Sequence, residues 1–261
     1  MKILLTNDDG IYAPGIYAIY KDLIKFADVT VVAPDVEQSS VGHGITLFYP
    51  LFVRKVKRKD KFFGYAVSGK PADCVKLGLE IILKGKKPDL VVSGINLGNN
   101  DGCSVFYSGT VAGAREGTLM GIDSMALSLD SFDNPKFEKS AKIGAKLAKL
   151  IFKNKLPQGT FLNVNVPPGA IKGILPTLQG AEPIHGHFKI RRNPHDKIYY
   201  WMTGKNPTHV NDNSIDTYAL KNGYATVNPV HCSLTDEKFL DKLHQWKFNL
   251  ARSRDFRRKN S

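Results

Sequence analysis

Two adjacent carboxylates, Asp8 and Asp9, directly follow a short apolar run at residues 3–5. Gly10 then allows a sharp turn, and an amphipathic segment at 15–26 comes next. Strand, polar turn and helix open a doubly wound α/β domain, which binds ligands at the carboxyl ends of its strands. Adjacent carboxylates repel each other, and a cation relieves that repulsion. Their hard oxygen atoms favour Mg²⁺, Mn²⁺ or Ca²⁺ over zinc. The alternative is that both aspartates only shape the turn or cap the helix.

A second polar segment, residues 37–44, follows a predicted β-branched strand at 29–33. Its small and polar residues disfavour both helix and strand and are typical of a ligand-binding loop. The loop carries Ser39 and Ser40, which we expect at the same sheet edge as the two aspartates. An ordinary turn role is their alternative. His43, in the same loop, is suited to phosphate binding or to protonation of a leaving group, with a structural hydrogen bond as its alternative.

A third loop, residues 94–102, follows the apolar strand predicted at 89–93 and contains three glycines and three asparagines. Such a loop can bring backbone N–H groups close to an anion. Ser108, Gly109 and Thr110 then precede a predicted helix of small residues. Free N–H groups, the positive end of the helix dipole and two hydroxyls make this helix start a candidate phosphate site. A plain N-cap by Ser108 or Thr110 is the alternative.

The order of the remaining elements indicates the fold class. A hairpin is predicted within 46–68, strands at 124–129 and 161–166, and helices at 71–83 and 136–152. Neither a G-x-G-x-x-G after the first strand nor a Walker A sequence occurs, so dinucleotide-binding and P-loop interpretations lose support. The sequence predicts a doubly wound, mostly parallel α/β core over residues 1–168.

The pattern changes after Pro168. Short β-like pieces are predicted at 173–178, 188–192, 197–203 and 224–230, and an amphipathic helix at 235–252. We therefore expect a β-rich extension with a terminal helix at 169–261, which covers the active site or pairs with another subunit.

Composition sets further bounds. A chain of 261 residues with 42% hydrophobic residues suits one large domain or a domain with a small appendage. No apolar run approaches the ~18 residues of a membrane span, so no membrane association is expected. Met1 leads directly into a strand, so no signal peptide is expected. Three scattered cysteines without metal-ligand spacing favour a reduced, cytoplasmic setting.

The chain is basic, with 37 Lys and Arg against 24 Asp and Glu, a net charge of +13. This charge favours anionic partners such as phosphorylated metabolites, nucleic acid or polyphosphate. The basic residues are spread out, and no motif interleaves them with aromatic residues as nucleic-acid modules do. We expect no stable nucleic-acid partner. Nucleic-acid binding as the main function remains an alternative that steep salt dependence of affinity would support.

Five stretches resemble a known family: ILLTNDDGI, VVAPDVEQSSVGHGIT, SGKPADCVKLG, LVVSGINLGNN and YSGTVAGAREG. They are similar to the SurE survival-protein family, the metal-dependent 5′/3′-nucleotidases. The resemblance extends through NVNVP, YYWMTG and GYATVNPVH and thus covers nearly the whole chain. It implies a Rossmann-like core, a Mn²⁺ or Mg²⁺ ion, and hydrolysis of nucleoside 5′- and 3′-monophosphates. In some members it implies trimming of short polyphosphate. It also implies a homodimer or homotetramer that exchanges C-terminal elements.

Carried over residue by residue, the resemblance implies one divalent metal ion per subunit on Asp8, Asp9, Ser39 and Asn96. Asp8, Asp9 and Asn96 are also the expected catalytic residues, and one aspartate orients the attacking water. The expected phosphate contacts are Asn7, Ser40, Gly42, His43, Ser108, Gly109 and Thr110. No covalent nucleophile is expected, because haloacid-dehalogenase-like phosphatases use an Asp-x-Asp pair and these aspartates are adjacent.

Three positions depart from the family pattern. Gln38 replaces a frequent Arg, Gly44 replaces a common serine, and Ser104 stands where an aspartate often follows the Asn/Gly loop. None is an expected metal ligand, so the departures bear on nucleotide preference. A non-catalytic nucleotide sensor built on the same loops is a further alternative, which a turnover assay separates.

Overall fold

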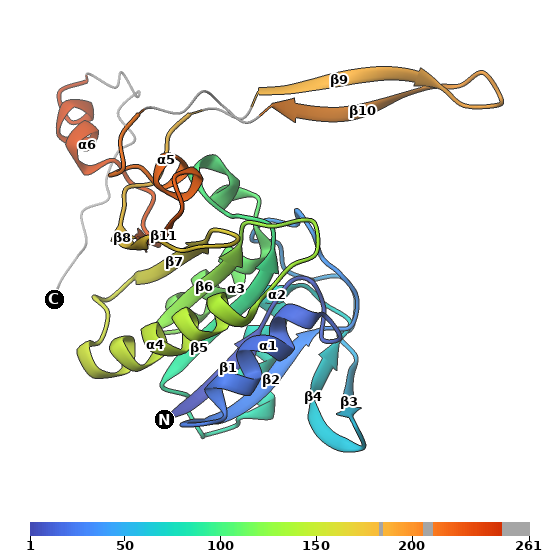
Figure 1. The fold of residues 1–261 in the computed structure, drawn as a ribbon, viewed down its shortest axis with the longest axis vertical. Coiled ribbons are helices and arrows are strands. Elements are labelled where there is room, and N and C mark those ends of the chain that lie inside the picture. The colour runs from blue at the N-terminus through green and yellow to red at the C-terminus, as the bar shows by residue number, and fades with distance from the viewer. Residues whose placement is uncertain (183–184, 206–210, 247–261) are drawn as a thin grey trace, which may run out of the picture.

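A nine-stranded sheet runs through the computed structural model, which describes residues 1–182, 185–205 and 211–246 (Figure 1). Its strand order is β3-β4-β2-β1-β5-β6-β7-β11-β8. The strands are β1 (Lys2–Thr6), β2 (Asp28–Pro34), β3 (Val53–Arg58), β4 (Lys61–Val67), β5 (Leu90–Leu97), β6 (Ser124–Leu129), β7 (Thr160–Val166), β8 (Gly173–Pro176) and β11 (Tyr224–His231). The central strands from β4 to β7 are mutually parallel. β3 and β11 run antiparallel to β4 and β7. The predicted mostly parallel α/β core is confirmed.

Helices cover both faces of this sheet. α1 packs against α4 on one face, and α2 packs against α3 on the other (Figure 1). The helices are α1 (Pro14–Leu23), α2 (Pro71–Leu77), η1 (Gly78–Ile82), η2 (Gly102–Phe106), α3 (Gly109–Leu119), α4 (Glu138–Asn154), α5 (Asp216–Lys221) and α6 (Glu237–Leu243). None of those in the described parts of the chain is long and apolar enough to cross a membrane.

The first strand is fixed by burial on both of its faces. Ile3 and Leu5 belong to the apolar layer under α1 and α4, and Leu4 to the layer under α2. A parallel strand covered by helices on both sides requires such a continuous apolar run. Full burial of each large side chain stabilises the fold by about 1.5–3 kcal/mol. The polar turn that follows β1 is therefore held on a rigid support.

The strand order reverses at β1, which lies between β2 and β5. The chain passes from β1 to β2 on one side and reaches β5 on the other. Open α/β sheets bind ligands outside the strand ends at such a switch point. The turn after β1, the loop after β2 and the end of β5 all lie at this edge of the sheet. These are the three segments in which the sequence predicts chemistry.

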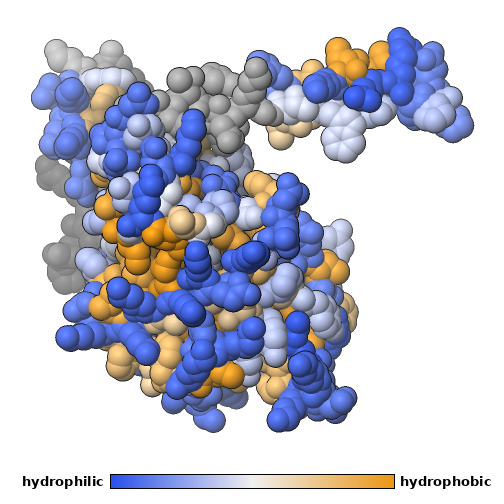
Figure 2. All heavy atoms as spheres, in the orientation of Figure 1, coloured by the Kyte–Doolittle hydropathy of each residue, from blue (hydrophilic) through white to orange (hydrophobic). Residues whose placement is uncertain are grey.

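A two-stranded antiparallel hairpin extends away from the body of the molecule (Figure 1). It consists of β9 (His185–Arg192) and β10 (Ile198–Lys205). The register pairs Phe188 with Met202 and Ile190 with Tyr200, so these side chains share one face of the ribbon. All four are exposed, and Figure 2 shows apolar surface on the hairpin. A solvent-exposed apolar face of this kind needs a covering surface.

Several predicted boundaries differ from the structure. The strand predicted at 89–93 continues to Leu97, because Asn96 and Leu97 still pair with β6. The hairpin predicted within 46–68 begins only at Val53, since Thr46 is bonded to α2 instead. The terminal helix predicted at 235–252 corresponds to α6, which spans only Glu237–Leu243. None of its residues is buried. Residues 247–261, including Phe248, lie outside the described part of the chain. α5 was not predicted.

Candidate active site

Asp8 is clamped against the start of α3. Only 5% of the residue is exposed, and the Thr110 hydroxyl donates a 2.5 Å hydrogen bond to its Oδ1. Its backbone carbonyl accepts a 2.8 Å bond from the Gln38 N–H in the loop after β2. Gly109 lies so close that a Cβ there would come within 2.8 Å of the Asp8 Cβ. Three segments distant in the sequence therefore meet at this one residue.

Both aspartates are hard to ionise in this environment. Burial raises the pKa of Asp8 to about 6, although the Thr110 hydroxyl and backbone N–H groups act in the opposite direction. Burial, and after it the charge of Asp8, raises the pKa of Asp9 to about 7. The Leu97 N–H donates to Asp9 Oδ2 at 3.1 Å and partly offsets these effects. A bound cation would favour the ionised form of both groups.

Asn96 and Ser39 bring neutral oxygen atoms to the same edge. Asn96 Nδ2 donates to the Gly98 carbonyl at 2.8 Å, which leaves Oδ1 as the atom able to coordinate a cation. Its neighbour Leu97 is the residue that contacts Asp9. The exposed Ser39 hydroxyl donates to Glu37, whose charge contributes to the raised pKa of both aspartates. Two carboxylates with amide and hydroxyl oxygens form the donor set of a hard divalent cation.

Metal sites can also be built from His, Cys, Asp and Glu side chains alone. Nowhere in the described residues do three or more His, Cys, Asp or Glu side chains gather closely enough to hold a metal ion. Among the described residues, a metal ion at the paired aspartates would therefore need neutral oxygen ligands as well.

The predicted phosphate turn at the start of α3 is present, and both of its hydroxyls have contacts within the protein. Ser108 is the N-cap and accepts from the Val111 N–H at 3.1 Å, which was the alternative interpretation. Thr110 donates to Asp8 and is buried. Ser108 keeps its O–H donor when it accepts in this way. The positive end of α3 adds anion affinity, because its first N–H groups have no intrahelical acceptors.

Asn7 and Gly42 have structural contacts in the described chain. Asn7 is fully buried, and its Nδ2 donates to the Gly10 carbonyl at 2.9 Å, which tightens the turn after β1. Gly42 has a φ of 55°, in the left-handed region that favours glycine, and its N–H donates to the Tyr107 carbonyl at 2.9 Å. That bond docks the loop on the segment that leads into α3. Ser40, with a φ of 57°, is exposed beside it.

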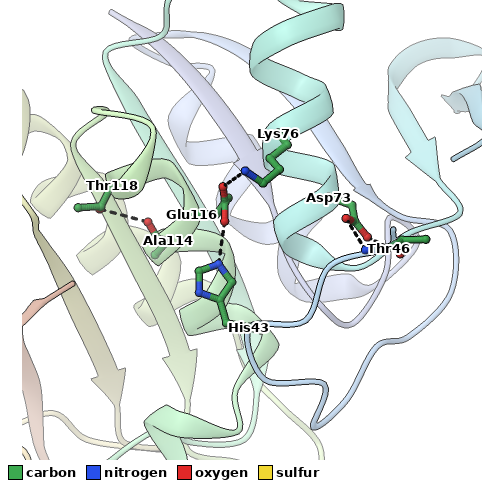
Figure 3. Close-up of polar contacts among 7 residues, drawn as sticks. All are labelled: His43, Thr46, Asp73, Lys76, Ala114, Glu116 and Thr118. Carbon is green, nitrogen blue, oxygen red and sulfur yellow. Dashed lines mark hydrogen bonds and ion pairs between the residues drawn. The ribbon is translucent and has the colours of Figure 1, made fainter. Parts of the chain in front are cut away.

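His43 is placed away from the aspartates. Its Nε2 lies 2.8 Å from an oxygen of Glu116, in the second half of α3 (Figure 3). Glu116 is about 10 Å along the helix from Gly109, at 1.5 Å per residue. The structural hydrogen bond, which was the alternative for His43, is the contact that the structure contains.

Sequence reasoning missed a buried amide network that holds the loop after β5. The backbone of Asn100 donates to Asn165 Oδ1 at 2.7 Å and accepts from Asn163 Nδ2 at 2.7 Å. The Asn100 side chain donates to Ser128 at 2.8 Å. All four residues are buried. The available signal was the two asparagines at alternate positions of the apolar strand FLNVNV, which therefore point to one face of the sheet.

A second missed contact joins that loop to the C-terminal part. Asp216 is fully buried and accepts from the backbone N–H groups of Gly102 and Gly180 at 3.1 and 2.8 Å. Burial and the charge of Asp216 raise the pKa of nearby Asp101 to about 6. These contacts tie the loop after β5 to the C-terminal part of the chain.

Comparison with known proteins agrees with the geometry. The profile of the family described as Survival protein SurE matches residues 3–185, which include every predicted site residue. The chain belongs to the SurE family. The suspected resemblance is thus confirmed.

Relatives of known name cover nearly the whole chain. The 5′-nucleotidase SurE of Syntrophobacter fumaroxidans is 45% identical over 249 residues, which cover 94% of this chain and 99% of the relative. The protein of the same name from Chlorobaculum tepidum is 42% identical over 247 residues, with 94% of each chain covered. The crystal structure of the SurE protein from Aquifex aeolicus has a TM-score of 0.83 at 41% identity and covers 93% of this chain and 98% of its own. The SurE-type α/β fold is therefore shared over this chain.

Proposed function

We propose that this chain is a nucleotidase, a phosphoric monoester hydrolase that releases phosphate from nucleoside 5′-monophosphates. Its SurE relatives at about 45% identity carry the name 5′-nucleotidase. The observation that carries the proposal is the pair of adjacent aspartates, of which Asp8 is held at the start of α3 and Asp9 at the end of β5. Activity on 3′-monophosphates and on short-chain polyphosphate is part of the proposal that remains to be measured.

Nucleotidases of this family depend on a metal ion in general. We propose one Mn²⁺ or Mg²⁺ ion per subunit, held by Asp8, Asp9, Ser39 and Asn96. When bound, such an ion polarises a phosphoryl oxygen and lowers the pKa of bound water. The Ser39 hydroxyl donates its hydrogen bond to Glu37, which leaves its oxygen lone pairs for the ion.

The chain's own groups would position the substrate and the water. The Thr110 hydroxyl fixes Asp8, and the Leu97 N–H fixes one oxygen of Asp9. One of the two carboxylates orients the attacking water. The N-terminal end of α3 and the Asn96 amide would stabilise the negative charge on the phosphoryl group as it transfers. His43 is left out of this set, because its Nε2 contacts Glu116.

The test is phosphate release from a panel of nucleoside 5′- and 3′-monophosphates and tripolyphosphate, with and without Mn²⁺ or Mg²⁺. Asp8→Asn and Asp9→Asn should each abolish metal-dependent release while the fold remains intact. Asp133→Asn, at an exposed position, is the matched control and should retain activity. Wild-type activity of either site variant at limiting Mn²⁺ would exclude that residue as a ligand.

We also propose that residues 169–261 assemble subunits into a homodimer or homotetramer, while residues 1–168 hold the catalytic site. The exposed apolar face of the β9–β10 hairpin supports this assignment, because a second subunit would remove it from water. A cytoplasmic setting is likewise proposed, and the three free thiols are compatible with it. Light scattering of the purified chain measures the assembly, and a mass near 29 kDa would contradict it.

A further inference from the structure

The loop that carries Ser39 has no regular structure of its own. Residues 35–52 contain no helix or strand, so their position depends on contacts with the rest of the fold. Two backbone bonds flank the serines: the Gln38 N–H donates to the Asp8 carbonyl, and the Gly42 N–H donates to the Tyr107 carbonyl. Side-chain anchors follow immediately afterwards, at His43 and Thr46.

Glu116 is the first anchor point and joins three elements. It is only 4% exposed, and its two oxygens contact His43 of the loop at 2.8 Å and Lys76 of α2 at 2.7 Å (Figure 3). Those hydrogen bonds outweigh burial and lower the pKa of the Glu116 carboxyl. A buried charge is retained only with such partners.

The negative charge of Glu116 is balanced by Lys76 even without the contact from the 35–52 loop. Lys76 pairs with Glu116 from α2 and neutralises it, whereas His43 adds a second contact from a segment outside the helices. A hollow between the loop and the two helices is lined by His43, Ile45, Lys76, Glu116, Leu119 and Met120. Apolar packing does not close this space, so the hydrogen bond of His43 is what connects the loop to α3 there.

The second anchor lies farther from the serines. Thr46 bonds to Asp73 of α2 through its backbone N–H at 2.9 Å and its hydroxyl at 2.7 Å. Between Gly42 and Thr46, Lys70 Nζ also donates to the Ile45 carbonyl at 3.4 Å, but that bond ties the loop to the start of α2. The contact of His43 is the one in this stretch that links the serine-bearing segment to α3. α3 is also the helix whose first residues clamp Asp8.

We propose that His43 and Glu116 are positioning residues that hold residues 39–42 against the Asp8 turn and thereby set the metal affinity of the site. This inference rests on the proposed metal-dependent function for its consequence in catalysis. The placement of the loop itself is measurable without substrate or metal.

The decisive comparison is between His43→Ala and Lys76→Ala, which remove different partners of the same carboxylate. Mn²⁺ binding to the metal-free protein is measured by electron paramagnetic resonance. The affinity should weaken about tenfold in His43→Ala, since a hydrogen bond to a charged group contributes on the order of that factor. Amide hydrogen exchange at Gln38 and Gly42 should accelerate. Lys76→Ala should stay within about twofold of wild type in both measurements, and His43→Gln, which keeps an N–H donor, should recover most of the affinity.

Two results would overturn the inference. One is His43→Ala with unchanged Mn²⁺ affinity and unchanged exchange at both amides. The other is Lys76→Ala with the same losses as His43→Ala, because general charge balance would then explain the cluster. If wild-type protein releases no phosphate while exchange and Mn²⁺ binding change as expected, the proposed function fails and the positioning role stands. If His43→Ala does not fold, His43→Leu, which keeps most of the side-chain volume but has no N–H donor, provides the same comparison.

Discussion

Replacing Gly109 with alanine adds a single methyl group where α3 meets Asp8. The new Cβ would lie 2.8 Å from the Asp8 Cβ and 2.9 Å from its Oδ2. Carbon atoms in contact prefer about 3.5–4.0 Å, so one partner must move by roughly 0.7 Å or more. Helix α3 is buried along most of its length, so Asp8 is the group that shifts.

The expected magnitudes separate stability from activity. Overpacking costs about 1–3 kcal/mol, and the better helix propensity of alanine returns up to about 1 kcal/mol. At roughly 2–4 °C per kcal/mol, the melting temperature should fall by only several degrees. A misplacement near 1 Å at a reacting centre costs on the order of 10²-fold. We therefore expect kcat/KM for metal-dependent phosphate release to fall about 100-fold in Gly109→Ala.

Gly113→Ala is the matched control in the same helix. A Cβ there would meet the Ser93 hydroxyl oxygen at 2.7 Å, a similar clash one turn farther from Asp8. It should cost comparable stability and leave kcat/KM within a few fold of wild type. Thermal unfolding and steady-state kinetics at several Mn²⁺ concentrations measure both quantities. Equal activity of Gly109→Ala and wild type would refute the claim that this close contact positions Asp8, and equal losses in both variants would assign the effect to α3 as a whole.

Three other perturbations test separate parts of the structure. Burial raises the pKa of Asp101 to about 6. The stability that protonated Asp101 contributes is therefore complete below about pH 4 and is lost as the pH rises through 6. In urea titrations, the unfolding free energy of Asp101→Asn should exceed that of wild type by on the order of 2–3 kcal/mol at pH 8, and the difference should close toward pH 4. Asn165→Ala leaves the buried N–H of Asn100 without its acceptor and should cost about 1–3 kcal/mol by urea unfolding, whereas a neutral effect would mean that the network is not maintained in solution. Tyr200→Lys places a charge on the apolar hairpin face and should lower the mass seen by light scattering, whereas Lys189→Glu, on the opposite face, should not.

Features encoded by neighbouring residues were predictable from the sequence. The apolar run before Asp8, the polar turn and the amphipathic helix identify β1, its loop and α1 at nearly their observed positions. The alternation of such units predicts the mostly parallel sheet, because each parallel crossover needs its helix. Loops after parallel strands share one edge, which indicated that Asp8, Asp9 and Ser39 lie close together. The full set of metal ligands came from the resemblance to the SurE family.

Contacts between distant segments were not predictable. Thr110 bonds to Asp8 across 102 positions, Leu97 to Asp9 across 88, and His43 to Glu116 across 73. Which partner a hydroxyl or imidazole meets depends on strand register and helix rotation, which residue types alone do not encode. The sequence therefore showed two hydroxyls at the start of α3 but not their contacts: Ser108 caps the helix and Thr110 donates to Asp8.

The position of β11 between β7 and β8 has a consequence for synthesis. β8 ends at Pro176, but its partner begins only at Tyr224, after the hairpin has been made. At about 5–20 residues per second, the nascent chain waits roughly 2–10 s with the outer edge of β7 unpaired. During that interval the hairpin, whose strands are neighbours in sequence, can already close within microseconds. β11, the next strand after the hairpin, pairs with β7 and completes the sheet. The hairpin can therefore form first, and its apolar face is open to other chains before the subunit has finished folding.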